Sequence, residues 1–239
     1  MEYDNTDHVE AFAKLCAQTP ARLGIGHAGA RLRTATLLKL RADHSEAIDA
    51  VWSEVNEDVF SGLGFVSIQT LVSSKEEYIR RPDLGRKFSP ETLAFIKNRC
   101  INAPDVQIIV ADGLSAPSIE HNVRDAYEVI ADSANQSGYS VGTPLFVHYG
   151  RVATMDAISE VLGAKVTILL VGERPGLATG DSMGCYMAYE SSTKKPESQR
   201  TVISNIHRNG TPPVEAGAQI VSLIKIMMRE KMSGVGLNI

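Results

Sequence analysis

The sequence predicts an α/β fold, in which a parallel sheet carries helices on both faces and follows a small helical region at the N-terminus. Two observations support this prediction. From about Phe65 onward, short apolar runs alternate with longer segments of helical periodicity. Residues 106–110 and 166–171 are almost entirely apolar, which is typical of strands buried on both faces. Strand–helix alternation of this kind implies crossovers between parallel strands.

Residues 1–56 are predicted to form the helical region, and residues 57–239 the sheet domain. Helices are expected at 8–18, where Val9, Phe12 and Leu15 recur at helical spacing, and at 33–40. Ser45 is expected to cap a third helix that runs to Trp52. The linker between the two regions is placed near residues 56–64, where glycines interrupt a polar run.

The elements of the second region follow in order along the chain. Strands are predicted at 65–72, 106–110, 144–149 and 166–171, with a fifth at 185–189 and a sixth or edge strand at 201–203. Helices are predicted after Ser89, which can act as an N-cap ahead of Pro90, and at 119–134, 157–162 and 214–228.

Composition excludes several classes of protein. The chain has 239 residues, of which 44% are hydrophobic and 22% charged, as in an ordinary globular protein. The net charge of -4 and the lack of a basic stripe argue against a nucleic-acid or membrane-surface partner. Cys16, Cys100 and Cys185 are too few and too scattered for a disulfide framework, so we expect reduced thiols in a cytoplasmic protein.

Polar residues collect after three of the predicted strands, at 112–115, 150–152 and 172–176. The third group places a charged pair, Glu173 and Arg174, directly after a buried strand. Each loop alone is explained as well by a structural role, as a helix cap or a turn, as by a role in ligand binding. Because parallel strands end at one edge of the sheet, three such loops together favour a ligand-binding edge.

Two glycine motifs have better explanations than the sites they resemble. Residues 24–29 fit G-x-G-x-x-G but lie between helical segments, whereas a dinucleotide site needs a strand before the motif and a helix after it. Residues 180–184 fit G-x-S-x-G, and Glu190 and His207 follow in hydrolase order. A strand is expected after Ser182, where a nucleophile elbow requires a helix.

His207 belongs to a segment that resembles the D-x-H-x-x-G signature of one class of cobalamin enzymes, but Asn205 replaces the aspartate. Asparagine cannot stabilise a charged imidazole as a carboxylate does. No pair of histidines has the spacing of zinc ligands. We therefore interpret His207 as a loop or cap residue.

Several long segments together resemble the small (light) subunit of ethanolamine ammonia-lyase. The resemblance extends from about Thr19 to the C-terminus. It is carried by residues 163–176 (GAKVTILLVGERPG), 203–207 (ISNIH), 210–216 (GTPPVEA), 33–34 (RT), 42–45 (ADHS), 81–86 (RPDLGR), 112–115 (DGLS) and 149–152 (YGRV).

The resemblance implies a Rossmann-like domain that binds adenosylcobalamin. The family enzyme converts ethanolamine to acetaldehyde and ammonia by a radical route, and its large subunit, a TIM barrel, holds the substrate and the adenosyl group. The small subunit covers the cobalamin from the other side. No catalytic residue and no metal ligand is then expected on this chain, and His207 need not bind cobalt because the cofactor's own base stays on the metal.

By the same resemblance, the cobalamin contacts fall on Val152, Glu173 and Val202, and we add Arg151 beside Val152. Relatives can carry cysteine at the position of Val202, so a backbone or packing contact is expected there. A carboxylate such as Glu173 can accept hydrogen bonds from the amide groups that surround a corrin ring.

The predicted assembly is a cytoplasmic hetero-oligomer with the large subunit. Some relatives have longer N-termini, which are associated with packing into bacterial microcompartments, and this chain starts close to the common core. Encapsulation therefore stays an open alternative. Two other functions also stay open: a self-sufficient nucleotide-dependent Rossmann enzyme that uses residues 24–29, and a purely structural partner subunit.

Overall fold

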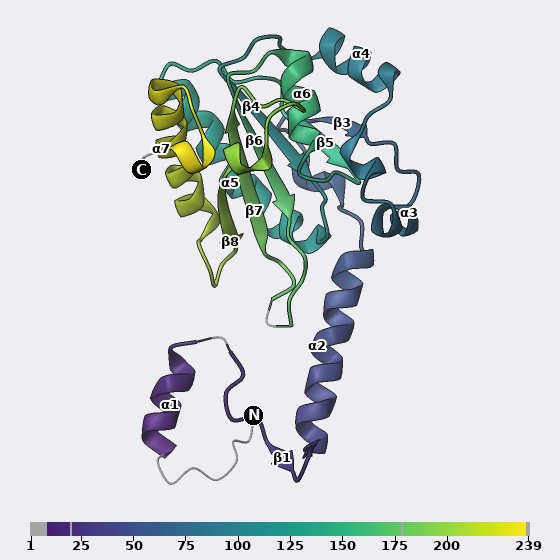
Figure 1. Ribbon diagram of the computed structural model, residues 1–239, viewed down its shortest axis with the longest axis vertical. Helices are drawn as coiled ribbons and strands as arrows, with labels where there is room; N and C mark the ends of the chain where they lie inside the picture. The colour runs from purple at the N-terminus through teal and green to yellow at the C-terminus, as the bar shows by residue number, and fades with distance from the viewer. Residues whose placement is uncertain (1–8, 20, 178, 238–239) are drawn as a thin grey trace.

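A computed structural model describes residues 9–19, 21–177 and 179–237 (Figure 1). The helices are α1 (Val9–Ala17), α2 (Thr34–Trp52), α3 (Lys75–Arg80), α4 (Pro90–Arg99), α5 (Ala116–Gln136), α6 (Thr154–Leu162) and α7 (Pro213–Glu230). The strands are β1 (His27–Ala28), β2 (Arg31–Leu32), β3 (Val66–Gln69), β4 (Val106–Ala111), β5 (Leu145–His148), β6 (Val166–Gly172), β7 (Met183–Tyr189) and β8 (Thr201–Ile206). Short 3-10 helices are η1 (Glu57–Phe60), η2 (Leu84–Arg86), η3 (Glu197–Gln199) and η4 (Gly234–Gly236).

The main sheet has six strands in the order β3-β5-β4-β6-β7-β8. The four strands from β3 to β6 along the chain are parallel, as predicted, but β7 pairs antiparallel with β6, and β8 antiparallel with β7. The prediction of a wholly parallel sheet is therefore wrong for the last two strands. Between β6 and β7, the described residues 173–177 and 179–182 contain no helix of the kind that a parallel crossover requires, and the chain returns antiparallel.

Helices cover both faces of this sheet, which confirms the predicted layers. The side chains of β4 alternate between two cores: Ile108 and Val110 pack on the face that carries α5 and α7, and Ile109 and Ala111 on the face that carries α4 and α6. All six residues of β4 and all seven of β6 are buried. Burial on both faces explains why these runs contain almost no polar residues.

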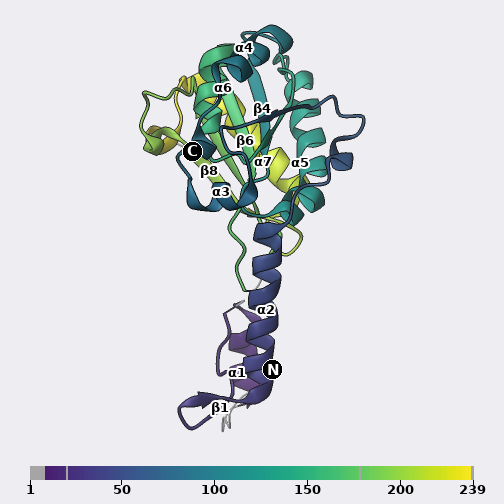
Figure 2. The same ribbon diagram turned by 90° about the vertical axis from the view of Figure 1, so that its right-hand side faces the viewer.

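Helix α2 is longer than predicted and stands away from the sheet (Figures 1 and 2). A helix start at Ser45 is wrong, because α2 runs unbroken from Thr34 to Trp52. Ser45 lies in its interior, and its hydroxyl donates to the carbonyl of Arg41 at 3.0 Å, a bond that lets serine stay within a helix. Only Thr36 and Ala50 of this helix are buried.

The segment expected as a linker is packed against the sheet. Phe60 ends η1 and is buried, with its ring centroid 4.6 Å from those of Phe65 and Phe146. This segment therefore contributes to the core of the sheet domain. The exact division at residues 56 and 57 stays a prediction.

The glycine motif at 24–29 forms part of the small antiparallel hairpin of β1 and β2, between α1 and α2. Gly29 adopts φ +64° where the chain turns from β1 to β2. The motif thus lies outside the six-stranded sheet and lacks the strand–helix setting of a dinucleotide site. None of the helices in the described ranges combines the length and hydrophobicity of a membrane span.

Candidate functional site

The carboxyl ends of β4 and β5 form a topological switch point. These strands are neighbours in the sheet, yet β4 continues into α5 on one face and β5 into α6 on the other. The two loops therefore diverge and leave a crevice between them, which is where open α/β sheets bind ligands. The strand β6 ends at the same edge.

The three predicted loops meet in a hollow of about 190 Å³ at this edge, which we call the switch-point hollow. Its lining comprises Tyr78, Gly113, Leu114, Gly150, Arg151, Val152, Val171, Gly172, Glu173, Arg174 and Tyr186. Residues from all three loops are present, so the prediction that they converge is confirmed. Val202 does not line the hollow, but it is paired across β7 and β8 with Tyr186, which does.

The buried Asp112 side chain connects two of the loops through hydrogen bonds to their backbone N–H groups. Its Oδ1 accepts the N–H groups of Gly113 at 2.8 Å and Gly150 at 3.0 Å, and its Oδ2 accepts the N–H of Tyr149 at 2.7 Å. The carboxyl group is buried, and this burial raises its pKa, although these N–H groups and the ammonium of Lys75 favour the ionised form.

Arg151 lies against the aromatic ring of Tyr78, from α3. Its guanidinium carbon is 4.0 Å from the ring centroid, and Nη2 donates to the Tyr78 carbonyl at 2.9 Å. The Tyr78 hydroxyl in turn donates to the Gly150 carbonyl at 2.8 Å. The Nε of Arg151 is buried and has no hydrogen-bond partner within the described residues. The donor capacity of Arg151 is thus not fully used within the described part of the chain.

Glu173 is held by the start of β7. Its backbone N–H donates to the Ser182 carbonyl at 3.0 Å, and its Oε2 accepts the Ser182 hydroxyl at 2.6 Å and the Asn205 N–H at 3.4 Å. Gly184 leaves room for the carboxylate, because a Cβ there would lie 2.8 Å from Oε1. Ser182 leads into a strand, as expected, so the G-x-S-x-G match is a support for Glu173 and not a nucleophile elbow.

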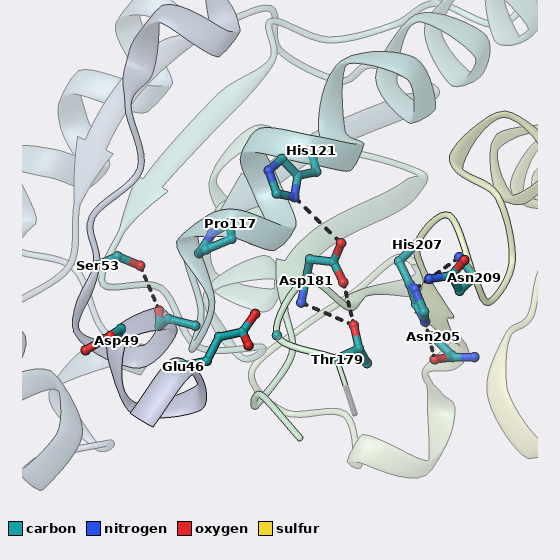
Figure 3. Close-up of a pocket in the computed structure, with 12 residues that line it drawn as sticks. Glu46, Asp49, Ser53, Pro117, His121, Thr179, Asp181, Asn205, His207 and Asn209 are labelled. Carbon is teal, nitrogen blue, oxygen red and sulfur yellow. Dashed lines mark hydrogen bonds and ion pairs between the residues drawn. The ribbon is translucent and has the colours of Figure 1, made fainter. Parts of the chain in front are cut away.

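A second, larger cavity of about 710 Å³ lies between α2, α5, residues 179–181 and the end of β8 with the turn that follows it (Figure 3). Figure 3 shows the Glu46 side chain of α2 pointing toward Asp181, with His121 of α5 next to Asp181. Burial opposes the charge of Asp181, but the Thr179 hydroxyl, His207 and His121 outweigh that cost and hold its pKa below the usual range. Asn205 lines this cavity and also contacts Glu173, so the two hollows are neighbours.

His207 lies in the wall of the larger cavity and is buried. Its Nε2 is 2.9 Å from the side-chain oxygen of Asn205, and its Nδ1 accepts the Asn209 N–H at 3.3 Å. Both ring nitrogens are therefore used within the turn, which fits the interpretation as a loop residue. Among the residues that the structure describes, no cluster of three or more His, Cys, Asp or Glu side chains could hold a metal ion.

Comparison with known proteins identifies the family. Residues 9–238 match the model of the ethanolamine ammonia-lyase light chain (EutC). The chain belongs to this family. The ethanolamine ammonia-lyase small subunit of Clostridium acetobutylicum is 64% identical over 230 residues, which cover 96% of this chain and 95% of that one.

Two further relatives carry the same name. The small subunit of Clostridium perfringens is 51% identical over 235 residues, covering 98% of this chain and 80% of its own length. That of Fusobacterium nucleatum is 46% identical over 239 residues, covering 100% of this chain and 81% of its own length. The resemblance in the sequence is thus confirmed at the level of the family.

Sequence reasoning missed three light-chain residues that shape the site. Tyr78 and Tyr186 line the hollow, and Ser182 orients Glu173. In the sequence, Ser182 stands out only as part of the G-x-S-x-G match, which indicates a nucleophile and not a residue that orients Glu173. Tyr78 gave no signal, because its short helix is far along the chain from the loops that it contacts.

Proposed function

We propose that this chain is the small subunit of an adenosylcobalamin-dependent ethanolamine ammonia-lyase and that it holds cobalamin against the large subunit. The enzyme would convert ethanolamine to acetaldehyde and ammonia. The observation that carries the proposal is the convergence of three loops at the switch point, with Arg151, Val152 and Glu173 in one hollow. We class the parallel strands and their crossover helices as Rossmann-like on the same ground.

The residues present fit a corrin. A corrin ring carries amide side chains at its edge, and each amide offers both N–H donors and a carbonyl acceptor. The Glu173 carboxylate can accept from such N–H groups, and the guanidinium of Arg151, which lines the hollow, can donate to a carbonyl. Val152 and, on the neighbouring strand surface, Val202 offer apolar contact; Val202 is 46% exposed.

The size of the switch-point hollow limits how much of a cofactor this chain can enclose. Pockets that enclose a drug-sized ligand usually measure roughly 300–1,000 Å³, and the switch-point hollow measures about 190 Å³. It can take only the edge of a cobalamin. The remainder would lie between this chain and the large subunit, in agreement with a hetero-oligomer in which neither chain encloses the cofactor alone.

Bound adenosylcobalamin would supply the radical chemistry. The role of this chain is to bind and orient the cofactor and to exclude water from one side of it. Glu173 and Arg151 would fix the orientation through hydrogen bonds, and Val152 and Val202 would cover the ring edge. No proton transfer is assigned to this chain. The predicted location is the cytoplasm, and packing into a bacterial microcompartment stays an open alternative.

The proposal is tested by co-expressing this chain with the large subunit and recording the absorption spectrum of the purified complex. We expect a bound corrinoid and cobalamin-dependent formation of acetaldehyde. In the Glu173→Ala complex we expect cobalamin affinity to fall by about tenfold, as for the loss of a hydrogen bond to a charged group. An assembled complex without cobalamin-dependent activity would refute the function, and unchanged affinity in the variant would remove Glu173 from the site.

A further inference from the structure

We infer that Asp112 is a positioning residue, which sets the turn at Tyr149, Gly150 and Arg151 for cofactor binding. This inference rests on the proposed function and deepens it. Asp112 follows the last residue of β4 directly and is 5% exposed, so its side chain contacts the loops from beneath. It does not line the switch-point hollow, and its effect on a ligand must pass through the residues that do.

The turn that Asp112 contacts is unfavourable without it. Tyr149 adopts φ +55°, a left-handed conformation that residues with a side chain rarely take. This conformation aims the N–H groups of Tyr149 and Gly150 at the same carboxylate, 2.7 and 3.0 Å from its two oxygens. Without an acceptor there, both N–H groups would lose their hydrogen bonds in the protein interior.

The same turn carries Arg151 and leads to Val152. On its other side the Gly150 carbonyl accepts from Tyr78, and the Arg151 N–H donates to the Gly85 carbonyl at 2.8 Å. The backbone is therefore fixed from both sides, and the Arg151 guanidinium lies on the Tyr78 ring as a result. A turn released by Asp112 would move the two predicted cofactor contacts together.

Asparagine at position 112 isolates this role. Asp112→Asn keeps the size of the side chain but replaces one acceptor oxygen by an N–H donor, so at least one of the backbone N–H groups loses its partner. We expect the dissociation constant for adenosylcobalamin of the complex with the large subunit to rise by about tenfold. With saturating cofactor we expect kcat within about threefold of the wild type, because the chemistry lies elsewhere.

Asp105 provides a matched control at the opposite end of β4. It precedes the strand and likewise accepts a backbone N–H, from Ser140 at 2.9 Å, together with the Ser140 hydroxyl and the Lys165 ammonium, each at 2.8 Å. Asp105→Asn should lower the melting temperature of the complex and leave its cobalamin affinity within about twofold. Equal weakening by both variants would reduce Asp112 to a structural role and overturn the inference.

A second variant keeps the test decisive where Asp112→Asn impairs assembly. Tyr149→Gly lets the turn adopt its positive φ without strain. Measured against Tyr149→Gly alone, the double variant Asp112→Asn/Tyr149→Gly should then bind cobalamin more weakly by clearly less than the roughly tenfold expected for Asp112→Asn. An undiminished effect would contradict positioning through the turn.

The failure of this inference differs from the failure of the proposed function. If the wild-type complex binds cobalamin no more tightly than the large subunit alone, the proposed function is wrong. If the wild-type complex binds it tightly and Asp112→Asn binds it equally well, only the role of Asp112 is wrong. Binding is read by the absorbance of the corrinoid, so neither result depends on turnover.

Discussion

Replacing Gly184 by alanine should move the Glu173 carboxylate without disturbing the fold. Gly184 lies in β7, and a Cβ built there would come 2.8 Å from Glu173 Oε1, 3.3 Å from Cγ and 3.4 Å from Cδ. Ordinary contact begins at 3.4 Å, so the carboxylate must retreat by about 0.6 Å, the difference between 3.4 and 2.8 Å. The atom in the way is the end of a flexible side chain, which can move.

This displacement is large relative to the hydrogen bond that holds Glu173. The Ser182 hydroxyl lies 2.6 Å from Oε2, and a retreat of the same size would lengthen the bond to about 3.2 Å, beyond the usual limit for O–H···O. A hydrogen bond to a charged group contributes about 1.5–3 kcal/mol. A displaced carboxylate that loses half of a hydrogen bond of this strength to cobalamin, about 0.75–1.5 kcal/mol, raises the dissociation constant about 3- to 12-fold.

The assay is a titration of the Gly184→Ala complex with adenosylcobalamin, followed by corrinoid absorbance, beside a thermal melt. We expect the affinity loss together with a change in unfolding free energy within about 1 kcal/mol, since alanine is intrinsically better than glycine in a strand. Gly180→Ala is the matched control, because its Cβ would meet only Ala50 at 3.7 Å. Wild-type affinity in Gly184→Ala, or equal loss in Gly180→Ala, would refute this reasoning.

Two further predictions concern stability. Arg200→Met should lower the unfolding free energy by about 3–5 kcal/mol in urea denaturation, because it leaves the buried carboxylate of Asp156 without the guanidinium that now lies 2.5 Å away. The exposed ion pair of Arg80 with Glu76 provides the control. A loss no larger in Arg200→Met than in Arg80→Met would disprove the prediction. The Lys165 ammonium and the Ser140 N–H lower the pKa of Asp105 from 3.8 to about 2, so this carboxylate stabilises the fold above pH 3.8 and loses that effect as the pH falls toward 2. When the unfolding free energy is measured as a function of acid pH, up to about 2 kcal/mol of its decrease should come from Asp105. The Asp105→Asn variant should lack this part of the decrease. An identical pH profile in the variant would contradict the role of Asp105.

The parallel part of the sheet was predictable because strands that are buried on both faces consist almost entirely of apolar residues. β4 and β6 are buried on both faces and are therefore continuous apolar runs. The antiparallel return of β7 was not predictable, because its apolar residues look the same in either direction and only the helix-free connection decides the direction. The unbroken α2 was also missed, since a serine such as Ser45 suits a cap and a helix interior alike.

The candidate site was predictable as an edge but not as a set of contacts. Strand ends place residues 112–115, 150–152 and 172–176 at one edge of the sheet, and the structure brings them together in one hollow. The support of Glu173 by Ser182 depends on a hairpin whose direction was not known in advance. Tyr78 and Arg151 are far apart in the sequence, and no sequence pattern relates their two segments, so their contact could not be predicted.

The most direct test of the central proposal compares cobalamin binding by the large subunit alone with binding by the assembled complex. Adding this chain should tighten the affinity for adenosylcobalamin by at least about tenfold, and Glu173→Ala should cancel a large part of that gain. Equal affinity with and without this chain would contradict a cofactor-holding role and favour a purely structural subunit.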